Sequence, residues 1–85
     1  MIQNIVQYDL EHDSAHGLLC SPDDDSIEHP GVLVFHDWSG RNSFADDKAK
    51  MLTTLGYHAL AVDMYGSGIV GNTVDEKTQL IAPLV

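Results

Sequence analysis

The stretch GVLVFHDWSGRN, residues 31–42, decides the fold of this 85-residue chain. Its first five residues are a continuous β-branched and aromatic run, typical of a parallel strand that is covered on both faces. A helix is predicted from Ser43, an N-cap with Asp46 three positions on, to about Leu55, where Gly56 ends it. A second buried strand, residues 57–62, follows. Residues 31–62 are therefore predicted to form one right-handed, parallel β-α-β unit.

The rest of the chain is arranged around this unit. Within residues 1–21, the apolar stretches 2–9 and 17–21 flank a polar segment, which predicts a two-stranded hairpin at the edge of a sheet. Residues 22–30, with prolines at both ends and no periodicity, form an acidic loop. Residues 63–85 form a glycine-rich loop and the start of a further helix, where Thr73 and Glu76 make a capping box. The fold class is α/β, a single incomplete domain.

The complete helix is expected to present a broad apolar face. Parallel strands normally need helices on both sides, and one helix covers only one face of a sheet. Apolar surface should therefore remain exposed and seek a partner. The helix residues assigned to the apolar face are Phe44, Ala45, Ala49, Met51, Leu52 and Leu55.

The composition narrows the choice of partners. The formal net charge is −9, and residues 1–30 contain seven acidic residues and no Lys or Arg. Such a field repels phosphate backbones and anionic membrane surfaces, so neither nucleic acid nor membrane is an expected partner. No apolar run approaches the ~20 residues of a membrane span, and the first residues lack a basic leader. With one cysteine in the chain, we expect a cytoplasmic protein.

The glycines Gly66, Gly68 and Gly71 have the spacing of a dinucleotide-binding turn. Such a turn needs its glycines directly after the strand and the helix beginning inside the motif. Here three residues separate the predicted strand from the first glycine, and the helix begins only at Thr73. A loop leaving a strand is the favoured interpretation, nucleotide binding is a minor alternative, and no cofactor is expected.

Metal and thiol chemistry are not favoured either. His12 and His16, with Asp13 between, would chelate on a helix, but on an extended strand they lie roughly 13 Å apart. Residues 23–28 lack the glycine and the final glutamate of a calcium loop, so no metal site is expected. Cys20, in an apolar stretch, is predicted to pack as a small buried hydrophobe.

The loop after the first buried strand is the most informative part of the chain. It gathers His36, Asp37, Trp38 and Arg41 beside Gly40, at the strand end where open α/β sheets place their sites. In the alternative interpretation, Trp38 packs over the start of the helix and Asp37 caps a local turn. We favour a functional site here.

The ordered set GVLVFHDWSGRN, a helix, then LGYHALAVDMYGSG and GNT resembles the N-terminal part of the dienelactone hydrolase family, within the α/β-hydrolase superfamily. The resemblance is close over residues 30–85 and looser over the hairpin. It implies that the backbone N–H of Trp38 is one oxyanion donor and that Asp37 is an accessory carboxylate beside the nucleophile. It also makes Tyr65, in an Asp-x-Tyr strand exit, a wall of the substrate pocket.

The family's nucleophile, acid and histidine should all come after the helix that begins near Thr73. This sequence contains no Gly-x-Ser/Cys-x-Gly elbow, because the outer positions around Ser67 are Tyr65 and Ile69. An end just after Pro83, inside an incipient helix, is expected of a truncated chain. The resemblance thus implies the front part of a hydrolase of small carboxylic esters or lactones, with half an oxyanion hole, a Cys or Ser nucleophile elsewhere, and no activity alone.

A second hypothesis belongs to another class of function. The short chain could serve as a non-catalytic assembly or binding module, because its exposed sheet would favour a homodimer or another partner. A monomer with a sharp thermal transition would contradict it.

Overall fold

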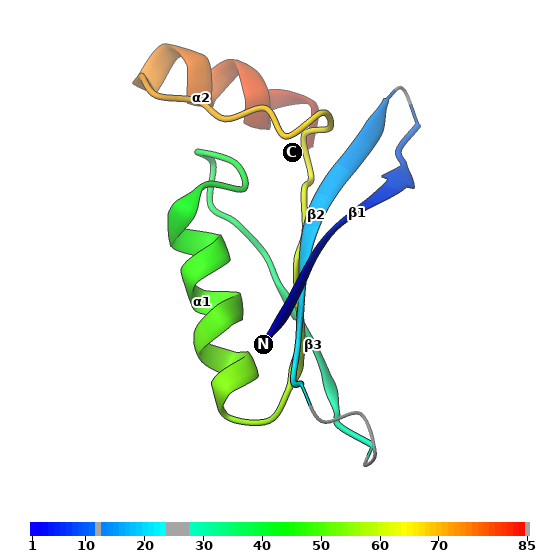
Figure 1. The fold of residues 1–85 in the computed structure, drawn as a ribbon. Coiled ribbons are helices and arrows are strands. Elements are labelled where there is room, and N and C mark those ends of the chain that lie inside the picture. Colours follow the sequence, from blue (N-terminus) through cyan, green and yellow to red (C-terminus); the bar gives the residue numbers. More distant parts are fainter. Residues whose placement is uncertain (12, 24–27, 85) are drawn as a thin grey trace.

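The computed structural model describes residues 1–11, 13–23 and 28–84, in which a four-stranded sheet carries one helix on its face and another across its end (Figure 1). The strands are β1 (Ile2–Asp9), β2 (Ser14–Ser21), β3 (Gly31–Val34) and β4 (His58–Ala61), in the spatial order β1-β2-β4-β3. β1 pairs antiparallel with β2, β2 antiparallel with β4, and β3 parallel with β4. The predicted α/β class is confirmed.

The parallel β3-α1-β4 unit forms as predicted, with α1 (Ser43–Thr54) between its strands. The N-cap of α1 is Asn42, not Ser43: the Asn42 backbone is extended, and its side-chain oxygen accepts the Phe44 N–H at 3.1 Å. Asp46 does not complete a capping box with Ser43, because its carboxylate pairs with Arg41 at 2.8 Å. At the other end the chain leaves the helix at Gly56, as predicted, and the Gly56 N–H donates to Thr53.

The second helix, α2 (Val74–Ile81), begins at the predicted cap and continues into a 3₁₀ turn, η1 (Ala82–Leu84). Thr73 Oγ1 accepts the Glu76 N–H at 3.2 Å, and the Glu76 carboxylate accepts the N–H of Asn72 rather than that of Thr73. No helix in the described part of the chain has the length and apolar character needed to cross a membrane.

The core lies between α1 and one face of the sheet, and small residues dominate it. Ala45, Ala49 and Thr53, spaced four apart, are the buried residues of α1, and the Thr53 hydroxyl donates to the Cys20 carbonyl. Their small size brings the helix close to the strands. The predicted apolar face of α1 is therefore only partly correct: Leu52 packs against the core, but Phe44, Met51 and Leu55 are exposed. The sheet residues of the core are Leu18, Cys20, Ala59 and Ala61, with Val34 packed against them.

The opposite face of the sheet is open. The prediction that β3 is covered on both faces is wrong for this chain, since α1 lies on one side and no described helix covers the other (Figure 1). Leu33 is 58% exposed and Phe35 62% exposed. Leu33 is aligned with Leu60, and Leu60 with Leu19, so a leucine row crosses the open face. This is the exposed apolar surface that one helix was expected to leave.

Candidate functional site

The loop after β3 is a tight turn held by hydrogen bonds between its own residues. Asp37 Oδ1 accepts the Ser39 N–H at 2.8 Å, and the Asp37 carbonyl accepts the Gly40 N–H at 3.2 Å. Gly40 has φ +99°, and a Cβ at this position would lie 2.6 Å from the Ile69 carbonyl oxygen. Only glycine fits here without strain, so this loop packs directly on the loop that leads to α2.

Trp38 lies at the exposed corner of this turn. Its carbonyl accepts the Tyr65 hydroxyl at 2.8 Å, and the Lys77 ammonium lies 5.7 Å from the centroid of its ring. Among the described residues, no acceptor takes the Trp38 backbone N–H. The contact with Lys77 means that the ring packs against α2, not over the start of α1. The N–H on which the oxyanion prediction depends is unoccupied.

Asp37 is exposed, and its carboxylate caps the local turn, as the alternative interpretation of this residue predicted. The Ser39 N–H holds the pKa of Asp37 below its ordinary value, with smaller contributions from the Ser39 hydroxyl, Lys77 and His36. The group is therefore an ionised carboxylate next to Trp38. Its role beside a nucleophile stays a prediction.

Tyr65 joins the two loops at this end of the sheet. Besides its hydroxyl bond to Trp38, its ring lies 4.9 Å from the His36 ring, centroid to centroid. Partial burial raises the pKa of the Tyr65 phenol, and the charge of Asp37 adds to this effect. Because the phenol stays protonated, it can donate its hydrogen bond to the Trp38 carbonyl throughout the neutral pH range.

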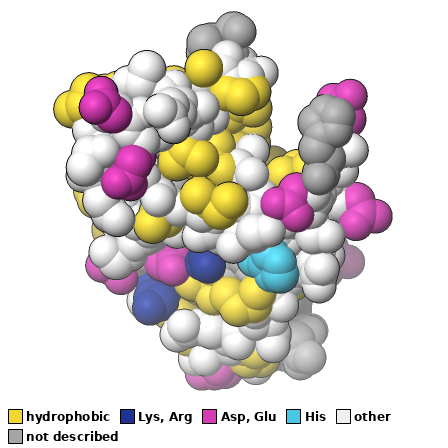
Figure 2. All heavy atoms as spheres, turned by 90° about the horizontal axis from the view of Figure 1, so that it is seen from above, with side chains coloured by type: hydrophobic (Ala, Val, Ile, Leu, Met, Phe, Trp, Pro, Cys, Tyr) yellow, Lys and Arg dark blue, Asp and Glu magenta, His cyan; other side chains and the backbone are white. Residues whose placement is uncertain are grey.

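A hollow of about 240 Å³ lies between the two loops and the C-terminal helices. Figure 2 looks down on this end of the molecule and shows hydrophobic side chains across its centre, with acidic side chains nearer its margin. Phe35, Trp38, Tyr65, Ile81 and Leu84 contribute apolar surface to the hollow, and His36 and Asp37 contribute polar groups. The three predicted site residues, Asp37, Trp38 and Tyr65, thus lie together on one hollow. Arg41 lies apart from it, paired with Asp46.

Asp63 is the residue whose importance the sequence did not reveal. It is fully buried two residues after the end of β4. Its two carboxylate oxygens accept four backbone N–H groups at 2.9 to 3.1 Å, from His16, Tyr65, Gly66 and Gly68. Burial is the largest single influence on its pKa and would raise it, but the four N–H donors outweigh burial and the net pKa is lowered. The usable signal was an acid shortly before two glycines, whose amides often surround an anion.

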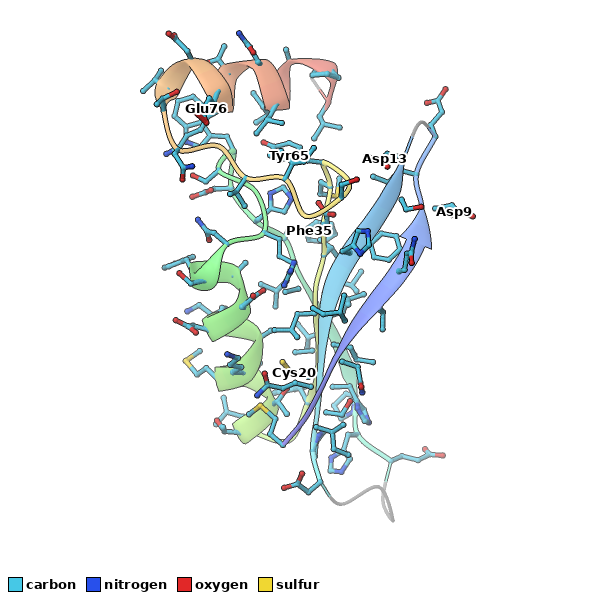
Figure 3. The ribbon with its side chains drawn as sticks, turned by 45° about the horizontal axis from the view of Figure 1, so that its top comes forward. Asp9, Asp13, Cys20, Phe35, Tyr65 and Glu76 are labelled. Carbon is cyan, nitrogen blue, oxygen red and sulfur yellow. The ribbon has the colours of Figure 1, made fainter. Side chains whose placement is uncertain are left out.

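The N-terminal hairpin contributes the remaining support for the loop after β4. Tyr8 Oη accepts the Asp63 N–H at 2.7 Å and donates to the Asp63 carbonyl at 3.0 Å. At the tip of the hairpin, Asp13 accepts the Ser67 hydroxyl at 2.8 Å, beside the loop (Figure 3). Ser67 has φ +53°, a strained value for a residue with a side chain. The hairpin contacts hold it there.

The glycine spacing does not create a phosphate site in this fold. The N–H groups of Gly66 and Gly68 donate to Asp63, and the Gly71 N–H donates to the Ser39 carbonyl at 2.7 Å. All three glycine amides therefore already have acceptors, and the anion in the concave loop is the chain's own carboxylate. This arrangement argues against the nucleotide alternative.

The remaining candidates lie away from the hollow. Cys20 is fully buried between α1 and the sheet, as predicted, and burial raises the pKa of its thiol (Figure 3). Within the described residues no three His, Cys, Asp or Glu side chains cluster as metal ligands would. His12, with its pairing to His16, and residues 24–27 of the acidic loop lie outside the described residues.

A sequence model of the dienelactone hydrolase family matches residues 15–85. The chain belongs to the dienelactone hydrolase family. No curated protein sequence gives a significant match.

Solved structures of dienelactone hydrolases and similar proteins match this chain. One named m3DLH matches with a TM-score of 0.89 and 29% identity, covering 98% of this chain and 35% of its own. A dienelactone-hydrolase-like promiscuous phosphotriesterase from metagenomic libraries matches with a TM-score of 0.84 and 29% identity, covering 92% of this chain and 33% of its own. The dienelactone hydrolase of Anabaena variabilis, at 17% identity and a TM-score of 0.57, covers 98% and 35% and shares the fold. The chain thus spans about a third of the length of these family members.

Proposed function

We propose that this chain is the N-terminal part of a carboxylic ester or lactone hydrolase of the dienelactone type, in which the Trp38 N–H forms half of the oxyanion hole. The observation that carries the proposal is the unoccupied Trp38 N–H in a loop on an apolar hollow, with Asp37 and Tyr65 beside it. A fixed N–H aimed at the charge that develops on a tetrahedral intermediate lowers the barrier to acyl transfer.

The other catalytic groups must come from sequence outside these 85 residues. No Gly-x-Ser/Cys-x-Gly elbow occurs in the chain. Its one cysteine, Cys20, is buried in the core and cannot reach a substrate in the hollow. That additional sequence would supply the nucleophile, the acid, the catalytic histidine and the second oxyanion donor. The chain alone is therefore expected to be inactive towards esters. The lone buried thiol also suits the proposed cytoplasmic setting.

A chimera tests this proposal. The chain would replace the part of m3DLH that it matches, about a third of that protein. Hydrolysis of p-nitrophenyl acetate would be measured for the chimera and for the 85-residue chain alone. We expect turnover by the chimera and none by the chain. Because only proline removes a backbone N–H, Trp38→Pro should lower kcat roughly 100- to 1000-fold, and Trp38→Ala, which keeps the N–H, far less.

Two outcomes would contradict the proposal. Equal losses from Trp38→Pro and Trp38→Ala, in variants whose circular dichroism matches the parent, would mean that the N–H is not a donor to the reaction. Ester turnover by the pure 85-residue chain that a single substitution abolishes would mean that the chain has a complete site of its own.

The second candidate function, a non-catalytic assembly or binding module, is favoured by one observation. Leu33 is more than half exposed on a sheet face that no described helix covers, and β3 is an edge strand. Such a surface associates with a second copy or with another protein. An inactive chimera together with a stable dimer of the chain would favour this function.

A further inference from the structure

The His36 side chain links the two loops of the site through both of its ring nitrogens. Nδ1 lies 2.6 Å from the Asp37 carbonyl oxygen, and Nε2 lies 2.9 Å from the Met64 backbone nitrogen. A carbonyl oxygen only accepts a hydrogen bond and a backbone N–H only donates one. One tautomer meets both demands: the proton is on Nδ1, which donates to Asp37, and Nε2 accepts from Met64.

The Asp37 carbonyl belongs to the same peptide unit as the Trp38 N–H. This peptide is trans, so its carbonyl and its N–H lie in one plane and point in opposite directions. Two donors hold the carbonyl, His36 Nδ1 at 2.6 Å and the Gly40 N–H at 3.2 Å. By fixing the carbonyl they also fix the direction of the N–H.

These bonds also change the strength of the N–H as a donor. A hydrogen bond to the oxygen of a peptide draws electron density from its nitrogen, so bonds in such a chain strengthen one another by about 10 to 30% each. The His36 bond is the shorter of the two on this carbonyl. The Trp38 N–H is therefore both oriented and polarised before any substrate arrives.

The other end of the His36 bridge rests on rigid structure. Met64 directly follows Asp63, whose carboxylate is buried under four N–H donors and whose backbone is bonded to Tyr8. The His36 ring also packs on Tyr65, which donates to the Trp38 carbonyl. With the Gly71 N–H bond to the Ser39 carbonyl, three hydrogen bonds join the loop after β4 to the loop after β3.

We propose that His36 is a positioning residue for the oxyanion donor: its ring carries the rigidity of the Asp63 loop to the Asp37–Trp38 peptide and fixes and strengthens the Trp38 N–H. The proposal rests on the hydrolase function proposed above, since it assigns His36 a role towards the donor of that reaction. His36 itself does not touch the substrate in this role.

The first test is the tautomer of His36 in the unmodified 85-residue chain. Nitrogen NMR distinguishes a protonated ring nitrogen from a lone-pair nitrogen, and we expect the protonated signal from Nδ1 and the lone-pair signal from Nε2. The reverse assignment would overturn the proposal. This measurement needs no variant and no catalysis.

Two variants of similar size separate the two ring nitrogens. The amide of Asn at this position lies near where Nδ1 lies, whereas the amide of Gln reaches only where Nε2 lies. In the chain, His36→Gln should shift the Trp38 amide proton signal upfield, because the Asp37 carbonyl loses its donor, and His36→Asn should restore most of the shift. His29→Gln, in the loop at the opposite end of β3, is the control and should leave the signal unchanged.

The same variants in the chimera connect the geometry to the reaction. His36→Gln should lower kcat about tenfold with little change in KM, less than removal of the donor itself, and His36→Asn should recover most of it. An unchanged Trp38 signal in folded His36→Gln, or equal kcat for the two variants, would overturn the proposal. An inactive chimera with the expected tautomer and Trp38 shift would instead count against the hydrolase function and leave the positioning geometry intact.

Discussion

At the scale of single residues, Asp63 explains the glycine spacing of a loop whose glycine amides already have acceptors within the chain. Three successive residues, Gly66 to Gly68, have positive φ, and such a backbone makes a concave ring of N–H groups suited to an anion. Asp63 fills it from within. The glycine motif therefore has a structural role: its N–H groups bind the Asp63 carboxylate, and both belong to the segment that follows β4.

We predict that Asp63→Asn destabilises the chain by roughly 2 to 6 kcal/mol. One carboxylate oxygen becomes an NH₂ group whichever way the amide is turned, and two backbone N–H donors lose their acceptor at about 1 to 3 kcal/mol each. Urea unfolding at pH 7 would measure the loss. Asp47→Asn, an exposed acid on α1, is the matched control and should change stability by less than about 0.5 kcal/mol.

Asp63→Asn should also change how the free energy of unfolding depends on pH. The folded pKa of Asp63 is lowered below the ordinary value of about 3.9, so its ionised form stabilises the fold above about pH 4. That stability is lost as the pH falls through the folded pKa. The native chain should therefore lose more stability between pH 5 and pH 2.5 than Asp63→Asn does, and equal losses would contradict the role assigned to the carboxylate.

At the scale of elements, the start of α1 gives a sharp comparison. Asn42→Ala should destabilise the chain by about 1 kcal/mol, because the Phe44 N–H loses the side-chain oxygen that caps the helix. Ser43→Ala, one residue on and inside the helix, should be nearly neutral. Thermal unfolding followed by circular dichroism would measure both. A larger loss for Ser43→Ala than for Asn42→Ala would mean that Ser43 is the N-cap, as the sequence pattern predicts.

The β-α-β unit could be predicted because it depends on local pattern. Its signals lie within a few residues of the elements that they specify. The apolar run at 31–35 specifies β3, and Gly56 specifies the end of α1. The Thr73 cap in the same way specifies the start of α2. The exact cap and the buried face of α1 could not. Asn42 and Ser43 are both good caps, and Ala45 and Ala49 lie among larger apolar residues that the short helix-to-sheet distance excludes from the core.

The candidate site was partly predictable for the same reason. Asp37 and Trp38 follow β3 and Tyr65 follows β4, and the carboxyl ends of two parallel neighbouring strands meet at the same edge of the sheet, so the three residues lie together. The role of Asp63 depends on N–H groups from the loop after β4 and from His16 in β2. The role of His36 depends on the orientation of the Asp37–Trp38 peptide, whose carbonyl also accepts the Gly40 N–H. Such contacts depend on tertiary structure and produce no characteristic residue spacing from which the sequence could predict them.

At the scale of the whole molecule, the open sheet face governs behaviour in solution. We predict that the chain self-associates above its 9.3 kDa monomer mass, because the row of Leu19, Leu60 and Leu33 has no covering layer. Sedimentation velocity over a range of concentrations would measure this. Leu33→Lys should shift the distribution towards monomer. Leu55→Lys, at an exposed leucine that follows α1 and lies outside the leucine row, should not. A monomer at all concentrations would contradict the prediction and the assembly function together.

The bonds between the hairpin and the loop after β4 also determine when the site can form. The N–H of His16 and the hydroxyl of Tyr8 reach Asp63 across 47 and 55 residues of sequence. A hairpin closes in about 1 to 10 μs, but contacts this distant in the chain form later and more slowly. During synthesis the apolar side of β2 stays uncovered until α1 and β4 have been made, and the hairpin can bond to the Asp63 loop only after the residues around Ser67 have followed. The site is therefore a late product of folding, and chaperone demand should be greatest in that interval.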